Sequence, residues 1–169
     1  MSKHGAMSEG ARVVASPLGS LRLAANVAGL THVEFLDDRD VIVNVTGDAA
    51  AAKHLNDAVA QLEEYFAGER RSFDLALSPI GTAFQLATWA VLRTIPFGST
   101  MTYGDQARAM GAPRAARAVG GANGKNPLAI VVPCHRVIGA SGDLTGYASG
   151  VARKSWLLDH ERAILCKQK

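Results

Sequence analysis

The sequence contains few of the features of an exported, membrane-bound or disulfide-stabilised protein. No segment approaches the run of about 18 apolar residues that a membrane-spanning helix needs, and residues 1–10 lack the apolar stretch of a secretion signal. We therefore expect a cytoplasmic protein without a membrane partner. Cysteine is also rare, since Cys134 and Cys166 are the only two. Neither has a CxxC partner or clustered histidines, so we expect no disulfide framework, no metal site and no cofactor.

Acidic residues are scarce in the second half of the chain. Residues 79–169 carry 11 Lys and Arg against 4 Asp and Glu, a balance of +7, whereas residues 1–78 carry 7 against 11, a balance of −4. A connection with turn residues at 68–81 separates the two, which predicts two domains, 1–78 and 79–169. The basic half could meet a polyanion such as nucleic acid, although an ordinary solvated surface often carries an excess of this size.

The N-terminal half has the pattern of a small sheet followed by one helix. Apolar alternation and β-branched residues predict three or four strands, at residues 12–16, 20–24, 29–36 and 41–45, with a hairpin turn at 17–19. Asp48 then precedes an amphipathic run that ends at Gly68 and predicts a helix. His32 and His54 are isolated, so we assign this half a structural role.

The second half is dominated by helix signals. Thr82 opens a capping box before an apolar run that extends through Ile95. Thr102 with Asp105 predicts a second helix start, and Pro113, after a glycine-containing turn, predicts a third. Two short helices around such a turn suggest a helix-turn-helix, which is a weak signal by itself. The whole chain is therefore expected to be α+β.

Small side chains fill residues 114–122, where we expect a thin helix with Arg114 and Arg117 one turn apart. The small residues there include Ala115, Ala116 and Gly121. The helix offers few groups that could meet base edges in the major groove, so sequence-specific recognition is not expected. It could instead approach the minor groove, with Arg117 replacing an extruded base. An Ala/Gly helix packed tightly against its neighbours would explain the same pattern equally well.

The best candidate nucleophile is Cys134, which follows an apolar run at 128–132 that we expect to be a buried strand. A thiol reacts as the thiolate, so it needs a nearby base or positive charge, and His135 and Arg136 are the candidates. Adjacent side chains of a strand point to opposite faces, so Cys134 and His135 can cooperate only if the chain turns, which Pro133 makes plausible. The alternative is an inert core thiol.

Glu161 lies among the apolar residues of the last predicted helix, where a carboxylate would be partly buried. Buried carboxylates need hydrogen-bonded partners, and a histidine is a natural one. This spacing suggests a relay of Cys134, His135 and Glu161. The alternative is a simple ion pair between Glu161 and an arginine on the surface.

Several motifs in order along residues 82–161 resemble the O6-alkylguanine-DNA alkyltransferase family. They are Tyr103-Gly104, the Arg114 to Gly121 helix, Asn126-Pro127, Pro133-Cys-His-Arg-Val-Ile138, Leu144-Thr-Gly-Tyr147 and Lys154-x-Trp156-Leu-Leu-x-His-Glu161. The resemblance implies an α+β fold with a ribonuclease H-like N-terminal domain and a winged-helix-like helix-turn-helix in the C-terminal domain. The first half of the chain is similar to the family only in layout.

The resemblance also implies a reaction and a role for each side chain. Cys134 would take the alkyl group from O6 of the guanine in a single irreversible transfer. His135 would accept the thiol proton through a water molecule and be oriented by Glu161. Tyr103 would donate a proton to the departing guanine, and Asn126 would shape the turn before the nucleophile.

DNA binding and the guanine pocket are implied in the same way. Tyr103 would turn the phosphate that swings the nucleotide out, while Arg117 fills the vacated stack beside Ala115, Ala116 and Gly121. The expected pocket wall is Tyr147, Ala148, Ser149 and Gly150. The expected partner is double-stranded DNA carrying O6-alkylguanine, with O4-alkylthymine left open, bound by a monomer that could assemble cooperatively on DNA.

Three other functions fit parts of the sequence. A cysteine hydrolase could use the same three side chains, but it has no use for the thin helix. A transcription factor could use the helix-turn-helix, although its recognition helix is bare. A non-enzymatic protein that binds alkylated DNA is the main alternative, and family relatives of that kind lack the cysteine that Cys134 provides.

Overall fold

The computed structural model describes residues 8–169, which divide into two compact units, one ending at Pro79 and the other spanning Ile80–Lys169. The first unit contains an antiparallel sheet and one helix, and the second is mainly helical, so the α+β prediction is confirmed. Within the described residues no helix is both long and apolar enough to cross a membrane.

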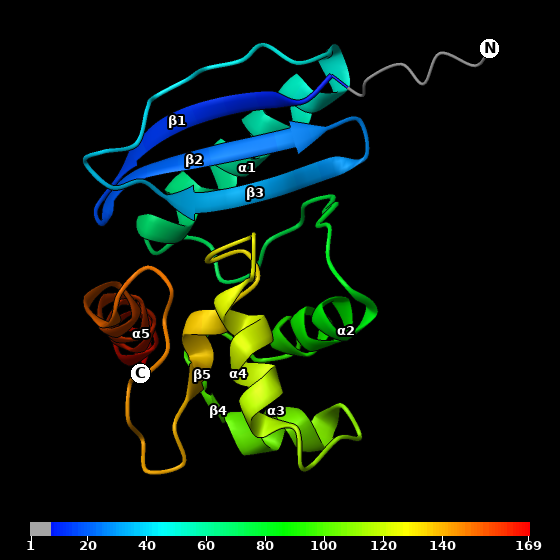
Figure 1. Ribbon diagram of the computed structural model, residues 1–169. Coiled ribbons are helices and arrows are strands. Elements are labelled where there is room, and N and C mark those ends of the chain that lie inside the picture. Colours follow the sequence, from blue (N-terminus) through cyan, green and yellow to red (C-terminus); the bar gives the residue numbers. More distant parts are fainter. Residues whose placement is uncertain (1–7) are drawn as a thin grey trace, which may run out of the picture. The chain divides into compact units, whose positions relative to one another are not determined.

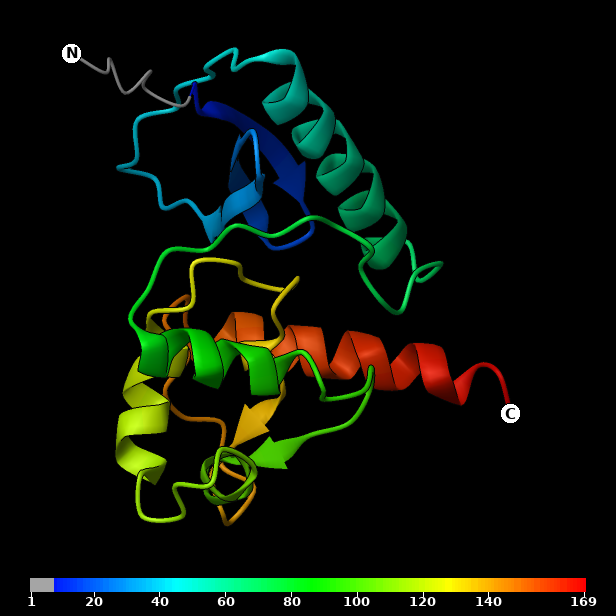
Figure 2. The ribbon, with the colours of Figure 1, turned by 90° about the vertical axis from the view of Figure 1, so that its right-hand side faces the viewer.

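The first unit is a three-stranded antiparallel sheet in the order β1-β2-β3, covered on one face by α1 (Figures 1 and 2). The elements are β1 Gly10–Ser16, β2 Gly19–Asn26, β3 Gly29–Phe35 and α1 Ala49–Phe66. The predicted hairpin is present, because Ser16 pairs with Gly19 across a two-residue turn. Asp48 caps α1 as predicted, accepting the N–H of Ala51 at 2.8 Å. Leu55 and Leu62 of α1 are buried together with Leu21 and Leu23 of β2.

The predicted strand at residues 41–45 is wrong. Its only ladder contact is an isolated bridge between Ala11 and Val45, and Val41 is 81% exposed. The reason lies at the edge of β1, where the N–H of Val13 donates to the side-chain Oδ1 of Asn44 at 3.0 Å. A side chain here takes the place of the next backbone carbonyl, so the ladder does not extend.

The second unit places four helices around a short parallel pair of strands (Figure 1). The elements are α2 Ala83–Leu92, β4 Met101–Thr102, α3 Tyr103–Ala109, α4 Ala116–Gly124, the 3-10 helix η1 Cys134–Arg136, β5 Val137–Ile138 and α5 Val151–Cys166. The predicted caps of α2 and α3 are present at Thr82 and Thr102. The first of these helices ends at Leu92 rather than Ile95, because Thr94 and Ile95 close tighter turns before the proline.

Helix α4 begins at Ala116, later than predicted. The N–H of Ala115 donates to the carbonyl of Ala112 at 2.9 Å, which closes a separate turn around Pro113. Arg114 therefore precedes the helix and does not lie one helical turn from Arg117. This finding corrects the predicted pairing of the two arginines.

Residues 128–132 are buried as predicted, but they do not form a strand. The chain folds into a compact turn in which the N–H of Val132 donates to Leu128 O at 2.9 Å. Ile130 has φ of 70°, a left-handed conformation that β-branched residues rarely adopt. The side chain of Asn126 bonds to both ends of the turn, accepting the N–H of Leu128 and donating to Val132 O.

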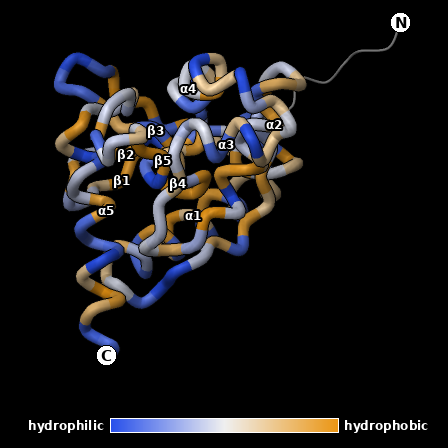
Figure 3. Tube along the Cα trace, turned by 90° about the horizontal axis from the view of Figure 1, so that it is seen from below, coloured by the Kyte–Doolittle hydropathy of each residue, from blue (hydrophilic) through white to orange (hydrophobic). Residues whose placement is uncertain are grey.

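Helix α5 alternates between hydrophobic and hydrophilic stretches along its length, as the colouring in Figure 3 shows. Leu157 and Leu158 are buried, and Lys154 and Glu161 are buried with them. Two ionisable residues thus share the buried side of this helix. Such groups require partners inside the protein, and these partners define the site described next.

Candidate active site around Cys134

The thiol of Cys134 is held at the first residue of η1 by the side chain of Asn126. Asn126 Nδ2 donates to Cys134 Sγ at 3.2 Å and to Val132 O at 2.8 Å, while Asn126 Oδ1 accepts the N–H of Leu128 at 3.0 Å. The thiol is half-buried. One amide group therefore closes the buried turn and presents a donor to sulfur, a contact that stabilises a thiolate as it forms.

The surroundings of Cys134 keep it protonated at rest. Burial raises the pKa of the thiol, and the hydrogen bond from Asn126 and the positive charge of Lys154 offset this only in part. A protonated thiol is a poor nucleophile. Reaction at Cys134 therefore requires a base that removes the proton.

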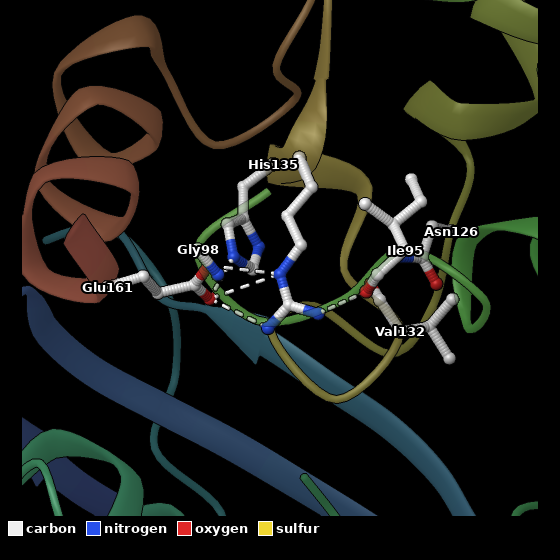
Figure 4. A network of polar contacts seen from close by, with 7 residues as sticks. Ile95, Gly98, Asn126, Val132, His135 and Glu161 are labelled. Atoms are coloured by element: carbon white, nitrogen blue, oxygen red, sulfur yellow. Dashed lines mark hydrogen bonds and ion pairs between the residues drawn. The ribbon is translucent and has the colours of Figure 1, made fainter. Parts of the chain in front are cut away.

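His135, the residue after Cys134, forms a fully buried contact with Glu161. His135 Nε2 lies 2.8 Å from Glu161 Oε1, and neither side chain is exposed to solvent (Figure 4). The 3-10 turn supplies the departure from strand geometry that cooperation between Cys134 and His135 needs. Glu161 is thus wholly rather than partly buried, and a surface ion pair is ruled out.

Glu161 is also the partner of Arg136, a role that sequence analysis missed. Arg136 Nε and Nη2 donate to the carboxylate at 3.0 and 2.8 Å, its Nη1 donates to Ile95 O at 2.7 Å, and the N–H of Gly98 donates to Oε2 at 3.0 Å (Figure 4). Arg136 was expected as a possible charge beside the thiol. The sequence places Arg136 in the cysteine motif, but it does not show that the side chain points toward Glu161.

This set of contacts fixes the protonation of the pair. Burial alone would raise the pKa of Glu161, but hydrogen bonds from His135 and Arg136 outweigh it and hold that pKa well below the usual range. Burial lowers the pKa of His135, against the opposing effect of Glu161. A charged Glu161 accepts the proton on Nε2 of a neutral imidazole. His135 Nδ1 is then the basic nitrogen, and it is buried without a hydrogen-bond partner among the described residues.

Tyr103 and Lys154 converge on one backbone carbonyl. Tyr103 Oη and Lys154 Nζ each donate to Thr145 O at 3.0 Å, and Nζ lies 5.8 Å from the centroid of the Tyr103 ring. Burial, and secondarily charge at Cys134, raises the pKa of Tyr103, so its hydroxyl keeps its proton. A Cβ at Gly146 would lie only 3.1 Å from Tyr103 Oη. Lys154 belongs to one of the motifs that carry the family resemblance, but the sequence predicted no role for it.

The four predicted pocket residues form the loop before α5. Tyr147 is half-buried, and its hydroxyl is buried without a hydrogen-bond partner among the described residues. Burial and the proximity of Cys134 raise its pKa well above the usual value. Ala148 is exposed, the carbonyl of Ser149 accepts Arg153 Nη1 at 3.2 Å, and Gly150 has φ of 96°.

Helix α4 has one packed side and one thin exposed side. A Cβ at Gly120 would lie 3.6 Å from the Tyr103 ring, whereas a Cβ at Gly121 would meet nothing within 4 Å. Arg117 is exposed on the open side, and Ala115 and Ala116 are half-buried. The small residues are therefore not explained by close packing alone, because part of this helix faces open space.

Comparison with known proteins gives consistent matches along most of the chain. Residues 11–79 match the ribonuclease-like domain of 6-O-methylguanine DNA methyltransferase, and residues 83–163 match its DNA binding domain. A methylated-DNA–protein-cysteine methyltransferase of Methanosarcina acetivorans is 49% identical over 146 residues, covering 86% of this chain and 94% of the relative. One of Mycolicibacterium paratuberculosis is 51% identical over 151 residues, covering 89% and 91%.

Solved structures agree with these matches. The crystal structure of Mycobacterium tuberculosis OGT in complex with DNA has a TM-score of 0.81 and 49% sequence identity, covering 91% of this chain and 93% of that one. That of the M. tuberculosis O6-methylguanine methyltransferase without a named partner has a TM-score of 0.80 and 44% identity, covering 95% and 99%.

Proposed function

The chain belongs to the 6-O-methylguanine DNA methyltransferase family, and from this membership we propose that it repairs DNA by moving the alkyl group of O6-alkylguanine onto Cys134. The observation that supports this assignment best is a half-buried thiol that accepts a hydrogen bond from Asn126 and is followed in the chain by a neutral histidine whose Nδ1 has no hydrogen-bond partner among the described residues. Such a site can convert the Cys134 thiol into a thiolate at the place where a substrate would bind.

The reaction begins with the thiol proton. His135 Nδ1 accepts it through an intervening water molecule, and Glu161 holds the imidazole so that this nitrogen faces away from the carboxylate. The sulfur then attacks the alkyl carbon in line, forming the C–S bond while the C–O6 bond breaks. The bonding electrons pass to guanine, which accepts a proton from Tyr103. Proton exchange with solvent restores neutral Tyr103 and His135, and Cys134 remains a thioether.

Repair by this route is stoichiometric. A thioether carbon is a poor electrophile, and the site contains no second nucleophile among the residues assigned to it. Each protein molecule therefore accepts one alkyl group. The expected lesion is O6-alkylguanine, and O4-alkylthymine stays open as a second substrate.

DNA binding belongs to the second unit. Its charge balance of +7 favours contact with phosphates, and the thin face of α4 around Gly121 suits close approach to a minor groove. Arg117 is exposed there and would fill the space left by the extruded nucleotide. The protein would act as a monomer, with cooperative assembly on DNA and a cytoplasmic location as further predictions from the sequence.

Intact mass spectrometry tests the proposal directly. Incubation with a duplex containing O6-methylguanine should replace the thiol hydrogen of Cys134 by one methyl group, a net mass gain of one CH2, and the reaction should stop after one equivalent. Cys134→Ser should stay unmodified, whereas Cys166→Ser, a matched change at the exposed cysteine, should react like the unaltered protein. Tight binding of the lesion without any mass change would instead establish a non-enzymatic binding protein.

A further inference from the structure

A buried pair of side-chain amides joins α3 to α4. Gln106 Nε2 donates to Asn123 Oδ1 at 3.0 Å, and Asn123 Nδ2 donates back to Gln106 Oε1 at 2.7 Å. Gln106 is completely buried, and Asn123 is 5% exposed. Gln106 Nε2 also donates to Thr88 O of α2 at 3.2 Å. A fully satisfied polar network of this kind rigidifies a core and selects one arrangement of it.

The same end of α4 has a second anchor. Trp89 Nε1 of α2 donates to Ala122 O at 2.9 Å in a buried contact. The carbonyls of Ala122 and Asn123 in turn accept the N–H groups of Lys125 and Asn126, each at 3.1 Å. The residues that α2 and α3 hold are thus the ones that guide the backbone into Asn126.

Asn126 completes a continuous path to the reacting sulfur. Its backbone is placed by Asn123, and its side chain donates to Cys134 Sγ at 3.2 Å. Hydrogen-bond strength depends steeply on angle and distance. A small displacement at the end of α4 would therefore weaken the contact that stabilises the thiolate.

We propose that Gln106, Asn123 and Trp89 are positioning residues for alkyl transfer, which fix the end of α4 so that Asn126 keeps its donor on Cys134. The inference rests on the proposed function and deepens it. It gives the helix assigned to DNA binding a second task, because the element that carries Arg117 at one end sets the nucleophile's donor at the other.

The first test uses Gln106→Leu/Asn123→Leu, made in a Cys166→Ser background. Removing both amides leaves neither of them unpaired and removes one further hydrogen bond, the one from Gln106 to Thr88 O, so the unfolding free energy should fall only modestly. The rate of methyl transfer should nevertheless fall about tenfold, which is about 1.4 kcal/mol and close to the lower end of what one hydrogen bond to a charged group contributes. Alkylation of Cys134 by iodoacetamide, followed by mass spectrometry, should shift to higher pH.

Two further variants separate positioning from stability. The exchange Gln106→Asn/Asn123→Gln keeps a facing amide pair and should recover most of the rate. Gln61→Leu is a matched control in the first unit, where Gln61 makes a similar two-bond contact with the backbone of Asp74. It should lower stability and leave the pH dependence of Cys134 alkylation unchanged.

The inference is overturned if the double leucine variant transfers methyl at the normal rate with an unshifted pH profile. Should that variant not fold, Trp89→Phe removes the bond to Ala122 O while keeping an aromatic ring, and an unshifted profile there has the same meaning. Iodoacetamide reports on the thiol without any DNA substrate. A failure of the unaltered protein to accept methyl would thus contradict the proposed function alone.

Discussion

Replacing Glu161 by glutamine would remove one charge from the centre of the site and change almost nothing in its shape. Glu161 is fully buried and accepts hydrogen bonds from His135, Arg136 and the N–H of Gly98. The guanidinium of Arg136, itself 6% exposed, would lose its counter-ion. Breaking a buried ion pair by removing one partner costs about 3–5 kcal/mol. At roughly 2–4 °C per kcal/mol, the melting temperature should fall by roughly 6–20 °C.

The same substitution should reduce transfer more than stability explains. A glutamine amide can donate to Nε2 of His135, which would place the imidazole proton on Nδ1, where the base must be free. Loss of general-base catalysis reduces rates by about 10²–10⁴. Single-turnover methyl transfer, measured on protein shown to be folded by circular dichroism, should therefore slow by at least about 100-fold. Urea unfolding at pH 7 gives the stability change separately.

The pH dependence distinguishes the charge from the packing. Because folding depresses the pKa of Glu161, its contribution to stability is present above its unfolded value of 4.5 and is lost as pH falls toward its folded pKa. The unaltered protein should lose stability in this acid range, and Glu161→Gln should lack that component. Glu161→Gln/Arg136→Met should be more stable than Glu161→Gln, since no unpaired charge remains. An unchanged transfer rate in folded Glu161→Gln would refute the relay.

Three further outcomes follow from the second unit. Arg117→Ala should slow repair in duplex DNA yet leave reaction with free O6-methylguanine base unchanged. Arg114→Ala, outside the helix, should slow repair in duplex DNA less and also leave the reaction with the free base unchanged. DNA affinity, measured by fluorescence anisotropy, should fall steeply with salt at any flanking sequence, with a slope of about −0.9 per phosphate contacted; a flat response would contradict phosphate binding. Gly98→Ala should destabilise more than Gly111→Ala in thermal melts, because both have positive φ but only at Gly98 would the added Cβ overlap Leu165.

Features set by neighbouring residues could be predicted from the sequence. Thr82 and Asp48 begin helices because a side-chain oxygen caps an N–H two or three residues later, which is a local event. The hairpin at residues 17–19 is local in the same sense. The predicted strand at 41–45 is absent, although its apolar pattern is typical of a strand. A strand also requires a partner with free backbone groups, and this segment makes only an isolated bridge.

Features set by contacts between distant residues could not be predicted from the sequence. The pattern at 128–132 correctly indicates burial, but burial does not distinguish a strand from a turn whose backbone groups bond to Asn126. The two partners of Glu161 lie 25 and 26 residues before it, and nothing local shows that the arginine and the histidine would share one carboxylate. Gln106 and Asn123 each resemble ordinary polar helix residues until the fold pairs them.

The raised pKa of Cys134 suits a protein that can react only once. An exposed thiolate would be consumed by any alkylating agent, whereas a half-buried thiol that burial keeps protonated reacts slowly without its base. In the proposed mechanism, transfer then depends on His135, on the donor from Asn126 and on an alkyl carbon held in line with sulfur. All three conditions are met together only when a substrate occupies the site. Burial lowers the reactivity of the thiol when no substrate is bound. It is therefore a source of selectivity, because the one thiol that can accept an alkyl group stays available for the lesion.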